Sequence, residues 1–225
     1  MRELTWIVDP ATGDVVVEGL TTEDLSALAG DLLPASRDLN CARPLTTVPL
    51  PIASQAHGPV LRVASLYHGS VVDGPGRRSV CQLQHCTHAC IGCYVPQTHS
   101  PDGGVLLGVD DVVAALLDTA GEPRDGVSIT GGEPFLQPTG LLALLQRLKM
   151  HGLHIVVYTG YTLEALARRP EPEIAEALHL TDILVDGPFV ARLADDAGEW
   201  RGSRNQRIVS DVRRVVDVLT TPHFT

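Results

Sequence analysis

The sequence predicts an α/β protein in which helices connect the strands of a parallel sheet. Between Val60 and Val185, short apolar segments alternate with segments whose apolar residues recur at helical spacing. The short segments are apolar on both faces, as buried parallel strands are. Several of them run directly into glycine-rich or polar loops, which is where α/β folds keep their functional sites.

Length and charge narrow the classes of function. A chain of 225 residues with 44% hydrophobic residues can form one large domain, or one domain with a small appendage. No apolar run reaches the ~20 residues of a membrane span, and the start lacks a secretory signal, so we expect a cytoplasmic protein with reduced thiols. The net charge of −10 argues against a nucleic-acid partner and is compatible with small-molecule or protein partners.

Residues 1–60 differ from the rest and are predicted to be an N-terminal extension of unknown role. Apolar residues at 4–8 and 15–18, separated by turn residues, predict a β-hairpin. A helix is expected over 23–29, and recurring prolines predict an irregular connector over 32–59. Cys41 in this connector is interpreted as a bystander thiol. The extension suits either a packed appendage or a docking element.

The remaining elements follow from periodicity. Apolar residues at 112, 113, 116 and 117 predict a helix over 109–120, with Asp110 as N-cap and Gly121 as its stop. A second helix over 139–150 places Leu141, Leu142, Leu145 and Leu148 on one face. Shorter helices are predicted at 162–168 and 173–178. The predicted strands cover 60–67, 79–83, 126–130, 154–158 and 182–185.

Four loops follow predicted strands, and because parallel strands end at the same edge, we expect these loops to meet at one rim. They are the segments 86–94, 130–134, 158–160 and 186–188.

The first of these loops carries three cysteines, Cys86, Cys90 and Cys93, spaced x3 and then x2. Three thiolates on one loop can hold a [4Fe-4S] cube and leave one iron open for chemistry. A zinc site is the main alternative, with His85, His88 or His99 as the fourth ligand. A disulfide framework does not suit a large chain with an odd number of cysteines. His85 and His88 are interpreted as loop residues.

The second loop contains Gly131, Gly132 and Glu133. Two glycines allow the backbone to approach a ligand closely, and the carboxylate suits an ammonium group. By itself, this segment also fits an ordinary tight turn.

The three cysteines followed by Gly-Gly-Glu one βα unit later resemble the radical S-adenosylmethionine (SAM) superfamily. The segment Asp73-Gly-Pro-Gly-Arg-Arg78 resembles the enzymes that activate glycyl radical enzymes. The branch most similar is the activating enzyme of anaerobic ribonucleoside-triphosphate reductase, and the match covers about residues 66–208. Its further matching segments are 93–94, 157–161, 182–189 and 200–208.

The resemblance implies a partial (β/α)6 radical SAM barrel over 61–210. The hairpin-and-helix extension predicted from residues 1–60 precedes it, and a C-terminal tail over 211–225 follows it. It implies that Cys86, Cys90 and Cys93 ligate the [4Fe-4S] cluster. It also implies a SAM pocket in which Tyr94 lies against the adenine and the Gly-Gly-Glu segment holds the methionyl end. The residues of this pocket would be Gly92, Cys93, Tyr94, Gly131, Gly132, Glu133, Thr159 and Gly160.

The implied reaction is reductive cleavage of SAM to methionine and a 5′-deoxyadenosyl radical, which takes a hydrogen from a glycine Cα of a partner enzyme. The implied partner is a glycyl radical enzyme of the anaerobic ribonucleotide reductase type, with flavodoxin or ferredoxin as electron donor. Two alternatives stay open. One is a radical SAM enzyme that modifies a small molecule or peptide, such as a carboxy-deazaguanine synthase, and the other is a non-catalytic zinc or iron–sulfur module.

The segment Trp200–Ile208 is rich in arginine on an acidic protein. Arginine forks bind carboxylates and carbonyls, and arginine and tryptophan are enriched at interface hot spots. We therefore expect Arg201, Arg204 and Arg207 to bind the glycine-bearing segment of the partner, although composition alone also fits a solvated surface loop.

Overall fold

The computed structural model describes residues 5–8, 15–18, 45–51 and 58–220, and the chain divides into two compact units, Met1–Ala42 and Arg43–Thr225. In the first unit, β1 (Thr5–Val8) pairs antiparallel with β2 (Val15–Glu18), which confirms the predicted hairpin. The helix predicted over 23–29 and Cys41 lie outside the described residues.

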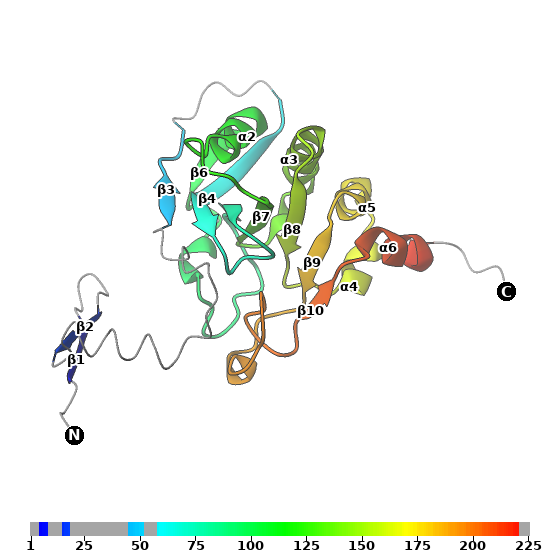
Figure 1. The fold of residues 1–225 in the computed structure, drawn as a ribbon. Helices are drawn as coiled ribbons and strands as arrows, with labels where there is room; N and C mark the ends of the chain where they lie inside the picture. The colour runs from blue at the N-terminus through cyan, green and yellow to red at the C-terminus, as the bar shows by residue number, and fades with distance from the viewer. Residues whose placement is uncertain (1–4, 9–14, 19–44, 52–57, 221–225) are drawn as a thin grey trace. The chain divides into compact units, whose positions relative to one another are not determined.

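The second unit is built on an eight-stranded sheet with the order β10-β9-β8-β7-β5-β4-β3, and β6 pairs with β4 (Figure 1). Its centre is parallel: β5, β7, β8 and β9 run in one direction, while β3, β4, β6 and β10 pair antiparallel. The strands are β3 (Thr46–Val48), β4 (Val60–Ser70), β5 (Arg78–Leu83), β6 (Val105–Gly108), β7 (Gly126–Gly131), β8 (His154–Tyr158), β9 (Ile183–Asp186) and β10 (Arg207–Val209).

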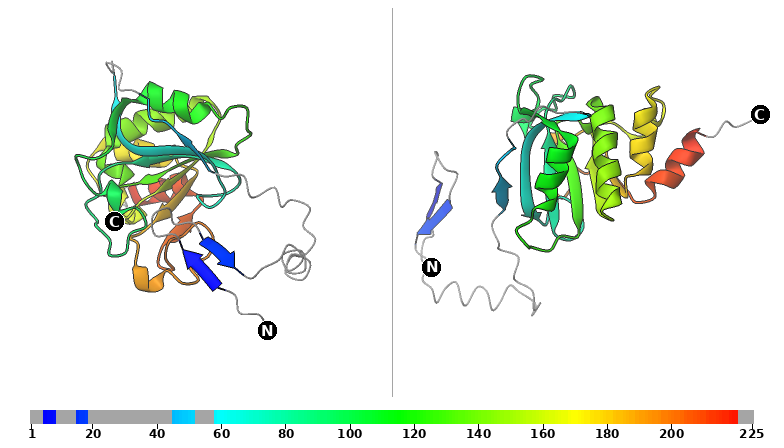
Figure 2. Two further views of the ribbon diagram at one scale, coloured as in Figure 1. Left: turned by 90° about the vertical axis from the view of Figure 1, so that its left-hand side faces the viewer. Right: turned by 90° about the horizontal axis from the view of Figure 1, so that it is seen from above.

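Helices connect the parallel strands and lie side by side along the sheet, in the order α2, α3, α5 and α6 (Figure 2). They are α2 (Val109–Leu117), α3 (Pro138–Met150), α4 (Leu163–Ala167), α5 (Pro172–His179) and α6 (Val212–Thr220). The predicted fold class, α/β with parallel strands alternating with helices, is confirmed, and the described part of the sheet has four parallel strands where the resemblance implied six. None of the described helices has the length and apolar character needed to span a bilayer.

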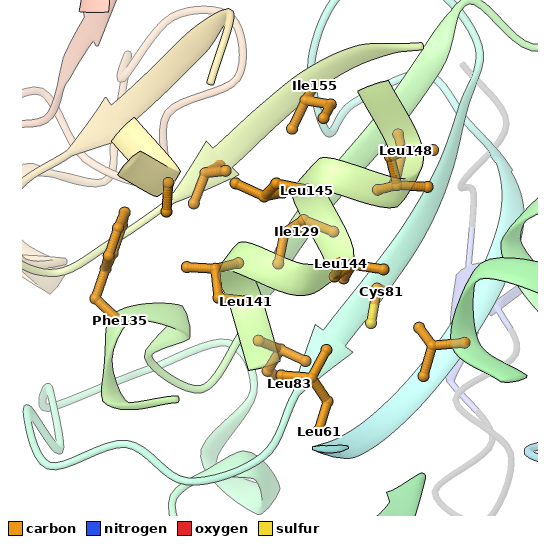
Figure 3. Packing of buried hydrophobic residues seen from close by; sticks show 14 of the residues in the cluster. Leu61, Cys81, Leu83, Ile129, Phe135, Leu141, Leu144, Leu145, Leu148 and Ile155 are labelled. Carbon is orange, nitrogen blue, oxygen red and sulfur yellow. The ribbon is translucent and has the colours of Figure 1, made fainter. Parts of the chain in front are cut away.

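One face of the sheet forms the hydrophobic core with the helices (Figure 3). Its residues alternate along the strands, as with Cys81 and Leu83 on β5, because successive side chains point to opposite faces. From α3 it receives Leu141, Leu144, Leu145 and Leu148, all fully buried. Leu144 therefore takes the place predicted for Leu142, which is only partly buried. Burial in this core raises the pKa of the Cys81 thiol to about 12, so this cysteine stays protonated.

The opposite face of the central strands is partly polar, so the prediction that these strands are apolar on both faces is wrong. Gln82 on β5, Ser128 and Thr130 on β7 and Tyr158 on β8 alternate with the core residues. Gln82, Thr130 and Tyr158 line a cavity, so these positions do not face a second layer of helices.

Arg78, the first residue of β5, is fully buried and connects the starts of three parallel strands. Its guanidinium donates to Ser128 Oγ at 2.6 Å, to the Val127 carbonyl at 2.6 Å and to the His154 carbonyl at 3.0 Å. A buried arginine needs such acceptors because an unpaired polar group in the interior is costly. This side chain therefore ties β5 to β7 and β8.

Several predicted boundaries differ from the structure. Helix α2 starts after Gly108, with Asp110 in its first turn rather than at the cap, and it ends at Leu117, before Gly121. The predicted irregular connector contains β3, and the predicted C-terminal tail contains α6, which buries Val212 and Val216. Strands β6 and β10 were not predicted. The boundaries proposed near residues 60 and 210 stay predictions.

Arg207 fixes the edge strand β10 to its neighbours. Its guanidinium donates to both carboxylate oxygens of Asp186, which is fully buried, and to both oxygens of Glu164 on α4, at 2.9 and 2.8 Å. The hydrogen bonds from Arg207 lower the pKa of Glu164 to about 2. The Glu164 contribution to stability is therefore present above its ordinary pKa near 4.5 and is lost as the pH falls towards about 2.

We expect Arg207→Ala to lower the free energy of unfolding at pH 7 by about 3 kcal/mol, because buried Asp186 would lose its counter-ion. Urea unfolding of the metal-free protein measures this. Arg204→Ala is the matched control, since this exposed arginine of the same loop should change stability by less than about 0.5 kcal/mol. Equal effects of the two variants would contradict the structural role of Arg207.

Candidate functional site

A cavity of about 900 Å³ opens at the carboxyl ends of the parallel strands. The structure brings the four loops expected at this rim to the same cavity. Residues from these loops that line it are Cys86, His88, Cys90, Cys93, Tyr94, Thr130, Gly131, Gly132, Glu133, Tyr158, Thr159, Gly160 and Gly187. Gly92 lies in the cysteine loop but is not among the lining residues.

The cysteine loop is irregular, and all three of its thiols are free and half-buried. Left-handed backbone conformations turn the chain at His85, Ala89 and Gly92, with φ of 78°, 44° and 75°. The Cys93 N–H donates to the Cys90 carbonyl at 3.1 Å, and the Val95 N–H donates to Cys93 Sγ at 3.5 Å. Burial raises the pKa of the Cys86 thiol. Three thiols therefore face one cavity from a single tight loop.

Gly131, the last residue of β7, and Gly132 directly after it are needed for a backbone contact within the protein. The Gly132 N–H donates to the Leu83 carbonyl at 2.6 Å, and the Glu133 N–H donates to the His85 carbonyl at 2.8 Å. A Cβ on Gly131 would lie 2.6 Å from the Leu83 nitrogen, and one on Gly132 would lie 2.3 Å from the His85 oxygen. The backbone at these glycines thus lies close to the segment that leads into the cysteine loop, in addition to the close approach to a ligand that the sequence predicts.

Glu133 is almost fully buried, and its carboxylate joins the ends of β7 and β8. One oxygen accepts from the Thr159 hydroxyl at 2.8 Å and from the Phe135 N–H at 3.1 Å. The other accepts from the Gly160 N–H at 2.8 Å. These contacts hold the carboxylate in one position at the rim. Its binding of an ammonium group stays a prediction.

His88, which the sequence analysis interpreted as a loop residue, makes contacts within the site that the sequence did not indicate. Its Nε2 lies 3.2 Å from Glu133 Oε2, close enough for an ion pair although outside hydrogen-bond geometry. The ring meets Tyr161 edge-on, with 4.5 Å between the ring centroids. It also fills the space beside Gly160, where a Cβ would lie 2.6 Å from the ring. His88 therefore anchors the cysteine loop to the end of β8, and its contacts are too distant in sequence for local spacing to indicate.

The three arginines expected to bind a partner occupy different environments. Arg201 lines the cavity, and its Nε is buried without a hydrogen-bond partner among the described residues. Arg204 is exposed and is not among the residues that line the cavity. Arg207 is held by Asp186 and Glu164, so the expectation of a free arginine fork is wrong for this residue. Only Arg201 has the placement that the prediction requires.

Further lining residues that the sequence analysis did not select come from the polar face of the sheet and the neighbouring turn. They are Tyr67, Asp73 and Gln82, and they join Tyr158 of the expected rim loop 158–160. The alternation of polar and apolar residues within β5 could have indicated Gln82.

The kinds of residue along the cavity suit a [4Fe-4S] cluster and SAM, although the described residues contain no group of three His, Cys, Asp or Glu side chains gathered closely enough to hold a metal ion. Three free thiols share one wall, and an amide N–H already points at one sulfur, as hydrogen bonds to cluster sulfurs do. The volume lies within the range of small-molecule sites. Tyr94, whose ring centroid is 4.9 Å from that of Phe189, offers an exposed aromatic face beside the thiols.

Comparison with known proteins identifies similar chains. Residues 72–209 match the family described as "4Fe-4S single cluster domain". The anaerobic ribonucleoside-triphosphate reductase-activating protein of Salmonella typhi is 36% identical over 153 residues, which cover 65% of this chain and 96% of the relative. The protein of the same name from Vibrio cholerae is 39% identical over 150 residues, covering 63% and 93%.

Two further similarities are more distant. The pyruvate formate-lyase-activating enzyme of Clostridium pasteurianum is 31% identical over 131 residues and 54% of each chain. Among solved structures, QueE from Escherichia coli aligns with a TM-score of 0.39 and 20% identity, covering 46% of this chain and 53% of QueE.

We expect Gly160→Ala to destabilise the metal-free protein by about 1–3 kcal/mol, because the added methyl group overpacks against the His88 ring. Thermal unfolding measures the loss. In the double variant His88→Ala/Gly160→Ala the clash is gone, so the cost of the methyl group should largely disappear relative to His88→Ala alone. An equal cost in both backgrounds would show that His88 does not occupy this position.

Proposed function

Because this chain belongs to the 4Fe-4S single cluster domain family and is a radical SAM activating enzyme of the glycyl radical type, we propose that it generates the glycyl radical of an anaerobic ribonucleotide reductase. The proposal rests on how much of the relatives is matched: the similarity extends over 96% and 93% of the length of the two reductase-activating proteins. The family match over residues 72–209 includes the cysteine loop, the Gly-Gly-Glu segment and the loop that contains Arg201.

The protein works with a [4Fe-4S] cluster and SAM. We propose that Cys86, Cys90 and Cys93 hold the cluster, and that SAM is bound by the residues around them on the rim. These are Gly92, Tyr94, Gly131, Gly132, Glu133, Thr159 and Gly160. When bound and reduced, the cluster supplies the electron that splits SAM into methionine and a 5′-deoxyadenosyl radical. We propose flavodoxin or ferredoxin as the one-electron donor, as the resemblance to the activating enzymes implies.

The side chains of the rim orient the reactants. Glu133 fixes the backbone of Gly160 and the hydroxyl of Thr159, so the edge that would hold the methionyl end is rigid before SAM binds. Tyr94 and Phe189 form an aromatic surface suited to the adenine ring. The cavity wall would exclude water from the bound SAM, so that the radical could take a hydrogen atom from the glycine Cα of the partner without side reactions.

Arg201 supports the proposed entry of a protein segment into this cavity. Its guanidinium lines the wall, and among the described residues it makes one long hydrogen bond, of 3.4 Å, to the Gln206 carbonyl. Most N–H donors of the guanidinium thus have capacity for carbonyl or carboxylate oxygens. We propose that Arg201, rather than the three arginines together, contacts the segment that carries the glycine.

Alanine at Cys86, Cys90 or Cys93 is expected to prevent assembly of a complete [4Fe-4S] cluster, because each variant removes one of three ligands. Iron and sulfide are counted after anaerobic reconstitution. Cys81→Ala is the control inside the described fold, since Cys81 lies in the core under the helices, and Cys41→Ala is a second control. Full cluster content in any of the first three variants would remove that cysteine from the ligand set.

The proposed function predicts that the reconstituted protein, with SAM and a strong one-electron reductant, produces an organic radical on anaerobic ribonucleotide reductase. Electron paramagnetic resonance of the reductase reads this out. Pyruvate formate-lyase serves as the comparison partner, because an activating enzyme for it is among the relatives. A radical on the lyase alone would overturn the proposed partner, and formation of 5′-deoxyadenosine without a radical on either protein would favour a small-molecule or peptide substrate.

A further inference from the structure

The loop before β10 is joined to the loop after β9 by hydrogen bonds between side chains of residues 203–206 and the backbone of residues 187–190. These bonds run from the Val190 N–H to Ser203 Oγ at 3.1 Å, from Asn205 Nδ2 to the Pro188 carbonyl at 2.7 Å and from Gln206 Nε2 to the Gly187 carbonyl at 3.0 Å. Ser203 is fully buried, whereas Asn205 is exposed. The polar residues of this segment thus hold a second loop in place.

The carboxamide of Gln206 holds both loops at once. Its Oε1 accepts from the Gly202 N–H at 2.7 Å and from the Ser203 N–H at 3.2 Å, while its Nε2 donates to the Gly187 carbonyl. Because backbone N–H groups only donate and carbonyl oxygens only accept, these partners fix which way the carboxamide points. Gln206 also lines the cavity, so these bonds lie beside the site.

The backbone that Gln206 holds lies against the aromatic surface of the cavity. A Cβ on Gly202 would lie 3.1 Å from a carbon of the Phe189 ring and 3.4 Å from a carbon of the Tyr94 ring. Phe189 stands two residues after Gly187, whose carbonyl is the other backbone group bound by Gln206. One side chain therefore fixes the backbone before Phe189 and the backbone that contacts both rings.

The position of Tyr94 depends on these contacts. Its side chain is 70% exposed, so it is held by the limited surface that it does bury. That surface includes the contact with Phe189, at 4.9 Å between the ring centroids, and the contact with residue 202. A ring that is held in place before a ligand stacks on it loses less conformational entropy on binding.

We propose that Gln206 is a positioning residue for SAM. Through the backbone of both loops, it holds the Phe189 and Tyr94 rings in the arrangement on which the adenine ring stacks. This inference rests on the proposed function, in which the two rings form the adenine surface. The segment that was expected to contact the partner then has a second role, because its polar side chains build one side of the SAM pocket.

The test compares Gln206→Met with Asn205→Leu. Each variant replaces a carboxamide with an apolar side chain of similar size and leaves the charge unchanged. Asn205 is exposed and is not among the residues that line the cavity, so water can replace its bond to the Pro188 carbonyl. Calorimetry on the reconstituted protein measures the Kd for SAM and the Kd for free methionine, with the cluster kept oxidised so that SAM is not cleaved.

Gln206→Met should raise the Kd for SAM about tenfold and leave the Kd for methionine unchanged, because methionine has no adenine ring. Asn205→Leu should change either value by less than about twofold. Equal rises for SAM and methionine in Gln206→Met would indicate general damage to the fold and would overturn the proposal. An unchanged Kd for SAM, or an equal rise in Asn205→Leu, would overturn it as well.

Gly202→Ala decides the question if Gln206→Met holds less iron than the wild type. This variant keeps the bonds of Gln206, and its methyl group presses on the Phe189 and Tyr94 rings. The Kd for SAM should rise about fivefold, with the Kd for methionine unchanged. An unchanged Kd for SAM would overturn the proposal, because the contact of residue 202 with the rings would then have no effect on adenine binding.

Tyr94→Ala separates this inference from the proposed function. If Tyr94→Ala raises the Kd for SAM while Gln206→Met does not, the inference alone fails. If Tyr94→Ala leaves the Kd for SAM unchanged, the adenine surface of the proposed function fails, and the inference fails with it.

Discussion

The buried carboxylate of Glu133 is the interaction on which the arrangement of the site depends. An ionised carboxylate in the interior is very costly unless it is paired or hydrogen-bonded. Here, hydroxyl and backbone donors from the end of β8 and from the turn after β7 satisfy it, and the His88 ring lies against it from the cysteine loop. Two strand ends and the loop must therefore stay together, because separating any of them would expose the charge to an apolar interior without partners.

The glycines of the site follow from this constraint. For Glu133 to reach β8, the chain after β7 has to run against the segment that enters the cysteine loop, and only residues without a Cβ fit at 131 and 132. For His88 to reach Glu133, its ring must pass over residue 160, where again no Cβ fits. Glycine at these three positions is required by contacts within the protein, before any approach to a ligand is considered.

The sequence was sufficient where local pattern determines structure. The central strands and α3 were predicted within a few residues, because long apolar segments such as 138–150 carry a clear period. It was insufficient for β3, β6 and β10, which are three or four residues long, partly exposed and defined by partners elsewhere in the chain. The same reason explains which site residues could be predicted. The cysteines and Gly-Gly-Glu are contiguous motifs, whereas His88, Tyr158 and the Arg207–Asp186 pair depend on contacts between residues far apart in the sequence.

The two faces of the sheet have different roles: one forms the hydrophobic core, and the other lines the cavity. On the helix-covered face, Cys81, Ile129 and their neighbours contribute burial that needs no ligand. On the other face and its rim, several buried polar atoms lack a hydrogen bond. Of the five such side-chain atoms among the described residues, those of His88, Tyr158 and Arg201 belong to residues that line the cavity, and the His88 atom lies 3.2 Å from Glu133 Oε2. A cavity optimised for stability alone would replace such groups with apolar ones. Three of the five unpaired atoms thus belong to residues around the cavity, which is where this fold gives up stability that apolar side chains would supply.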